Sequence, residues 1–111
     1  MAFVNSNEGK DVVMVCGRVV QSGDQSITSG KGFSIADGGT GTTTVTFDRA
    51  FDTLIAVTAS SLASGDTMHV GTITHTDGTT GPSIVFQGNA VSDGTDGDTT
   101  FSFITIWEVD T

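Results

Sequence analysis

The sequence predicts an all-β protein, folded as a single antiparallel β-sandwich or jelly roll of seven to eight strands. Typical helix formers are scarce among the 111 residues, because leucine, glutamate and lysine occur only twice each. The 15 glycines recur every few residues, so no window is long enough for a stable helix. Threonine, valine, phenylalanine and isoleucine dominate the patterned stretches, and these side chains suit a pleated surface.

Seven apolar runs bounded by turn signals are the predicted strands. In chain order they are residues 11–20, 31–35, 42–47, 54–60, 67–75, 82–88 and 99–109. The run TTTVTF at 42–47 alternates strictly, which places Val45 and Phe47 on the face opposite the intervening threonines. Pro82 begins its strand, where the missing N–H is tolerated. Turns at such short intervals are typical of antiparallel sandwiches, and the pattern leaves the strand order open.

The remaining segments are predicted to be an arm and loops. Residues 1–10 form an N-terminal arm, and residues 11–111 form the sandwich domain. Residues 21–30 and 89–98 are the longer predicted loops, and ADGGTG at 36–41 is a turn that needs positive φ at its glycines.

The first and last strands are apolar on both faces. In the first, Val12, Met14 and Cys16 alternate with Val13, Val15 and Val19. In the last, Ile104 and Ile106 lie opposite the face of Phe101, Phe103, Trp107 and Val109. A two-layer sandwich covers only one face of each sheet, so a loop, the arm or another subunit must cover the second face. The predicted subunit or capsid contacts are Phe3, Val4, Val13, Met14, Val15, Ile104 and Ile106.

The charge distribution excludes some classes of partner. The net charge is −9, and the four cations Lys10, Arg18, Lys31 and Arg49 are scattered along the chain. Binding to nucleic acid or an anionic membrane needs clustered cations, so we expect neither partner. The N-terminus lacks the pattern of a secretory signal, and no segment approaches the ~20 apolar residues of a membrane span. We therefore expect a soluble protein made in a cytoplasm.

The stretch DGTDGDTT at 93–100 places Asp93, Asp96 and Asp98 within six positions. An EF-hand loop has acids at its positions 1, 3 and 5 and a glutamate at position 12, whereas these acids stand at relative positions 1, 4 and 6 with no closing glutamate. Asp-Gly used twice is turn chemistry, and the same pair recurs elsewhere in the chain. The sequence therefore favours a polar hairpin loop over a cation site, and we expect no metal.

No residue pattern indicates catalysis. His69 and His75 would lie on one strand face with Cα atoms about 20 Å apart, too far to share a metal, and both are predicted to be surface residues. Cys16, the only cysteine, is predicted to be an inert buried thiol. No nucleophile elbow, phosphate-binding loop or dinucleotide fingerprint is present. We expect neither an enzyme nor a cofactor.

From residue 30 onward the sequence resembles known protein families. GKGFSIADGGTGTTTVTFDRAFDTLIAVTAS, 30–60, resembles a block found in bacteriophage virion proteins, with a glycine-rich lead, a Gly-Thr-Gly turn and a "TVTF…F" element. The element formed by Val45, Phe47, Phe51 and Val57 also resembles part of the H-type lectin sandwich, whose members are usually trimers. No sugar-binding residue can be carried over, and Trp107 lies in a strand with core-like alternation, so packing is its expected role.

The resemblance implies a structural virion protein that decorates the outer capsid surface as a cement protein, as a homotrimer in contact with the major capsid protein or another virion protein. The alternative is a receptor- or carbohydrate-binding module of a tail or head fibre, with its ligand in loops 21–30, 61–66, 76–81 or 89–98. In either case the expected location is the virion.

Overall fold

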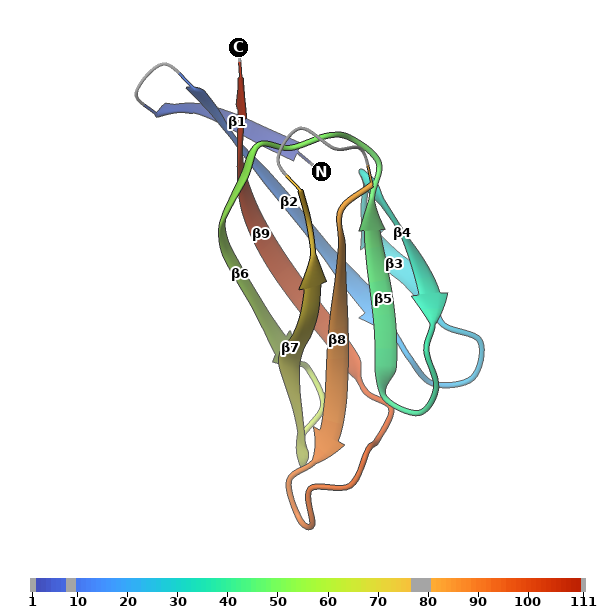
Figure 1. Ribbon diagram of the computed structural model, residues 1–111. Coiled ribbons are helices and arrows are strands. Elements are labelled where there is room, and N and C mark those ends of the chain that lie inside the picture. Colours follow the sequence, from blue (N-terminus) through green and yellow to red (C-terminus); the bar gives the residue numbers. More distant parts are fainter. Residues whose placement is uncertain (1, 8–9, 77–80, 111) are drawn as a thin grey trace.

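The computed structural model of the chain describes residues 2–7, 10–76 and 81–110, and side chains within 10–76 and 81–109. These residues form an elongated β-sandwich of two antiparallel sheets, with no helix in the described ranges (Figure 1). The strands are β1 (Ala2–Asn7), β2 (Lys10–Val20), β3 (Ser26–Gly30), β4 (Phe33–Asp37), β5 (Thr42–Phe47), β6 (Thr53–Ser61), β7 (Asp66–Thr74), β8 (Ser83–Ala90) and β9 (Thr100–Asp110). The predicted all-β sandwich is confirmed.

The two sheets differ in size. Sheet A has the order β1-β2-β9-β6, and β3 also pairs with β2. The strands β1 and β3 share one edge of β2, because β1 pairs with its residues 10–15 and β3 with its residues 17–20. Sheet B has the order β4-β5-β8-β7. The strands β2 and β9 therefore form the centre of sheet A, paired over the full length of both strands.

Two strands lie outside the seven predicted ranges. Residues 2–7, predicted as part of an arm, form β1 in a hairpin with β2. Residues 26–30 form β3 inside the range predicted as the loop 21–30. The β3 sequence SITSG has one apolar residue and is mostly exposed, so it has no hydrophobic pattern by which a strand is recognised. In the turn after β4, Gly39 and Gly41 have the predicted positive φ, whereas Gly38 does not.

Aromatic side chains fill the core between the sheets. Trp107 is fully buried and stacks on Phe51 with ring centroids 4.5 Å apart, and Phe47 meets it edge-on at 5.2 Å. The indole N–H of Trp107 donates to the Thr105 hydroxyl at 2.8 Å, and that hydroxyl donates to the Val15 carbonyl at 2.9 Å. The predicted packing role of Trp107 is confirmed, and its polar atom is satisfied inside the core.

A buried amide joins the two sheets at one end of the sandwich. Gln21 directly follows β2 and is 1% exposed. Its Nε2 donates to the Gly41 carbonyl at 2.7 Å and to the Thr43 hydroxyl at 2.9 Å, and its Oε1 accepts from the Thr99 N–H at 3.0 Å. A buried polar group destabilises the fold unless it is hydrogen-bonded, and Gln21 is bonded by both ends of its amide.

We expect Gln21→Ala to lower the free energy of unfolding by about 2–4 kcal/mol, because it leaves the Thr99 N–H and the Gly41 carbonyl without their buried partner. Urea denaturation followed by tryptophan fluorescence measures the change. Ser34→Ala, on an exposed position of β4, is the control and should stay within about 0.5 kcal/mol of wild type. Equal midpoints for the two variants would contradict the role given to Gln21.

Candidate functional site

The outer face of sheet A carries apolar side chains that no described part of the chain covers completely. Alternation along β2 and β9 buries one set of residues and turns the intervening set outward. Ile104 is 41% exposed, and Ile55, at a bulge in β6, is 47% exposed. We call this surface the outer apolar face, and it comprises Val12, Met14, Cys16, Ile55, Ile104 and Ile106.

The position of Ile55 on this face follows from the bulge. Leu54 and Val57 pack against the core, and the register of β6 against β9 shifts between Leu54 and Ala56. Two consecutive residues, Ile55 and Ala56, therefore lie on the solvent side, and both are exposed. The register pairs Ala56 with Ile106, so the apolar surface continues from β9 onto β6.

The structure separates the predicted contact residues into three groups. Val13 and Val15 are 1% and 2% exposed and belong to the core, so their side chains are not available to a partner. Met14, Ile104 and Ile106 lie on the outer apolar face. Phe3 and Val4 lie in β1, opposite Met14 and Val13 in the backbone register, and their side chains lie outside the described set.

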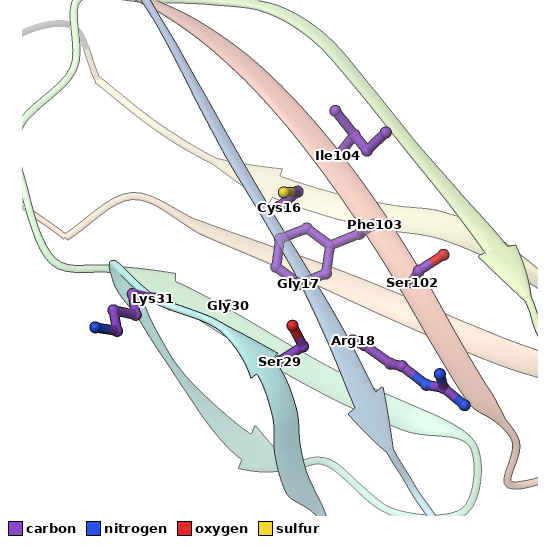
Figure 2. A pocket seen from close by; sticks show the side chains of 9 residues that line it. All are labelled: Cys16, Gly17, Arg18, Ser29, Gly30, Lys31, Ser102, Phe103 and Ile104. Carbon is purple, nitrogen blue, oxygen red and sulfur yellow. The ribbon is translucent and has the colours of Figure 1, made fainter. Parts of the chain in front are cut away.

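A surface depression of about 710 Å³ opens at one end of this face (Figure 2). It spans β3, β2 and β9, and its lining comprises Cys16, Gly17, Arg18, Ser29, Gly30, Lys31, Ser102, Phe103 and Ile104. In Figure 2, Lys31 and Arg18 lie on opposite sides of the group, and Cys16, Phe103 and Ile104 lie above the line that joins them. Both cations are exposed, and neither has an ion-pair partner within the described residues.

Two paired glycines are part of the lining of the depression. Gly17 and Gly30 are register partners in β2 and β3. A Cβ on Gly30 would lie 2.4 Å from the Cys16 carbonyl oxygen, and Gly30 has a φ of +106°. A Cβ on Gly17 would lie 2.3 Å from the Phe33 ring. Neither position accepts a side chain without movement. A Cβ on Gly17 would enter the core beside Phe33 and Phe103, so this glycine allows β4 to pack closely against the inner face of sheet A. The sequence does not predict this site, because the strand β3 that forms one wall lies in a range with the pattern of a loop.

Cys16 differs from its prediction as a buried thiol. It is half-buried and lines the depression rather than the core. The physical reason is the alternation of β2, in which Val15 on one side of it points inward.

The acidic loop 91–99 uses its carboxylates to fix its own conformation. Asp93 accepts from the backbone N–H of Thr95 at 3.1 Å and from its hydroxyl at 2.7 Å. Asp96 accepts from the Asn89 side chain at 3.1 Å, and Asp98 from the Gly41 N–H at 2.7 Å. No group of potential metal ligands occurs among the residues that the structure describes. The arrangement is that of a hydrogen-bonded turn.

The two histidines occupy different environments. His69 is exposed on β7, as predicted. His75 is half-buried: its Nε2 lies 3.0 Å from the Asp52 carbonyl oxygen, and its ring meets Trp107 edge-on at 5.2 Å. The prediction of a surface residue fails for His75, because the register of β7 shifts between Val70 and Ile73 and so changes the face on which later residues lie.

Four polar loops meet at the end of the sandwich opposite the chain termini (Figure 1). They are residues 21–25, 38–41, 62–65 and 91–99. Hydrogen bonds link them: the Gln21 side chain donates to the Gly41 carbonyl at 2.7 Å, and the Val91 N–H donates to the Gly65 carbonyl at 2.8 Å. Of the predicted ligand loops, 76–81 includes residues 77–80, which lie outside the described residues.

Comparisons with known proteins add no assignment: no family model, no curated protein and no solved structure matches the chain. Within the described ranges, no helix is long and apolar enough to cross a membrane.

Hydrogen bonds from the Thr95 hydroxyl, which has the larger effect, and from the Thr95 backbone N–H hold the pKa of Asp93 below the ordinary value of an aspartate. This contribution to stability is therefore present above the unfolded pKa and is lost as the pH falls through the lower folded pKa. We expect Thr95→Ala to raise the carboxyl titration midpoint of Asp93 in an NMR titration. Ser92→Ala is the control and should leave it in place. An unchanged midpoint in Thr95→Ala would refute the cause given.

Proposed function

We propose that the chain is a structural virion protein of a bacteriophage that binds the outer capsid surface as a decoration (cement) protein. The outer apolar face is the observation that carries the proposal. Six apolar side chains from three adjacent strands lie together there, and Ile55 and Ile104 are more than two-fifths exposed. A contiguous exposed apolar surface of this kind is typical of a protein–protein contact.

The physical role of such a contact is mechanical. Burying apolar surface across a subunit boundary stabilises the assembly by about 25 cal/mol per Å². A standard interface buries about 800 Å² on each partner, so the face contributes a substantial part of the association free energy before the cost of ordering is subtracted.

Two further observations support an assembly role. The segment 30–60 resembles a block of phage virion proteins, and it supplies β4, β5 and most of β6. Every buried polar side chain of the described core has a hydrogen-bond partner within the fold; these residues are Gln21, Thr43, Thr99 and Thr105. These buried polar residues therefore stabilise the fold itself. The exposed apolar side chains have no such role within the fold, and this favours a contact with another molecule.

We expect Ile55→Asp to lower the occupancy of capsids of the phage that encodes this chain by at least about tenfold, because a carboxylate would be buried at the contact. Co-sedimentation of purified protein with emptied and DNA-filled capsids measures occupancy. Ile73→Asp is the matched control, since Ile73 is 42% exposed on sheet B, and it should bind as wild type. Equal binding by Ile55→Asp, or no capsid binding by the wild type, would overturn the proposal.

The four polar loops at one end support a second candidate function, a receptor- or carbohydrate-binding module of a tail or head fibre. Their exposed hydroxyl, amide and carboxylate groups provide donors and acceptors at the tip of an elongated domain measuring 46 × 22 × 20 Å. If the protein is such a module, a glycan array probed with the assembled protein should show saturable binding. The double variant Asp93→Ala with Asp96→Ala should abolish that binding. An array without hits would count against the fibre module and leave the capsid proposal standing.

A further inference from the structure

The depression in sheet A is the one place where the cations of this acidic protein gather. The chain has four lysines and arginines against 13 acids, and two of the four, Arg18 and Lys31, line this single site. The third, Arg49, lies over the Phe51 ring at 5.5 Å. The site therefore combines an apolar floor with two positive charges, in a molecule whose net charge is −9.

The acidic loop 91–99 has the complementary character. Val91 is 63% exposed, the highest value among the large exposed apolar residues, and Asp93 and Asp96 are exposed nearby. Hydrogen bonds from Thr95 and Asn89 hold these carboxylates in place. The entropic cost of ordering the loop on binding is therefore small. Figure 1 shows the loop as the projection at the end of the molecule opposite the chain termini.

We propose that the depression binds the acidic loop of a second copy of this chain, with Val91 against the apolar floor and the carboxylates of Asp93 and Asp96 beside Arg18 and Lys31. The contact joins two different surfaces and is heterologous, so it repeats from copy to copy and closes into a ring or continues as a filament. A two-fold contact through the depression is disfavoured, because it would place the cations of two copies against each other.

This inference does not rest on capsid binding. It concerns the association of the protein alone. The depression shares Cys16 and Ile104 with the outer apolar face, but the capsid proposal is tested at Ile55 on β6, which does not line the depression. Loss of one contact can therefore be observed while the other persists. A ring of three copies would also agree with the trimer that the lectin resemblance implies.

A charge-swap series tests the contact. Sedimentation equilibrium of the full-length wild type should show an oligomer larger than a dimer that weakens as salt is raised, because exposed charges are screened with a Debye length of about 8 Å at physiological ionic strength. Two double variants, Arg18→Glu with Lys31→Glu and Asp93→Lys with Asp96→Lys, should each weaken association at least about tenfold. The quadruple variant that combines them should recover most of the loss.

The control for the loop variant is Asp24→Lys with Asp48→Lys, which makes the same change in net charge at two exposed aspartates and should associate as wild type or more tightly. Near-ultraviolet circular dichroism confirms that each variant is folded. A monomeric wild type, a dimer indifferent to all four substitutions, or a quadruple variant no better than the doubles would overturn the proposal. Isothermal titration with a short-chain fatty acid that competes with self-association would likewise assign the depression to a small ligand instead.

Discussion

The pairing of β2 with β9 is the constraint on which the rest of the structure depends. The two strands run antiparallel over eleven residues each and occupy the centre of sheet A. Because side chains alternate across a sheet, the register that buries Val13, Val15 and Trp107 also turns Met14, Cys16 and Ile104 outward. A slip of one residue would exchange the two sets. The well-packed core and the apolar outer surface are therefore consequences of one register.

Much of the fold follows from the sequence alone. Seven of the strands were predictable because each combines β-branched or aromatic alternation with glycine or aspartate turns at its ends. The strands that were not predicted are edge strands. β3 is positioned by backbone pairing with β2, and backbone hydrogen bonds do not require any particular pattern of side chains. The bulges in β6 and β7 also escaped, and each moved the residues beyond it to the other face, as His75 shows.

The candidate site was predictable only in part. The apolar excess on β2 and β9 is visible in the sequence, and it correctly places Met14, Ile104 and Ile106 on a second face. The depression is not visible, because it depends on two glycines far apart in sequence becoming register partners and on Arg18 and Lys31 coming from different strands and turns. Long-range register determines which scattered cations become neighbours, and no local pattern encodes it.

The same glycines connect the core to the surface. Gly17 has no side chain because the Phe33 ring occupies that space and packs edge-on against Phe103 at 5.0 Å. Gly30 has none because β3 approaches the Cys16 carbonyl too closely for a Cβ. The packing of β4 against β9 thus requires that residue 17 of β2 carries no side chain on the inner face of sheet A. A side chain at Gly17 would displace the Phe33 ring and overpack the core, so the close approach of the two sheets fixes glycine at a position that also lines the outer depression.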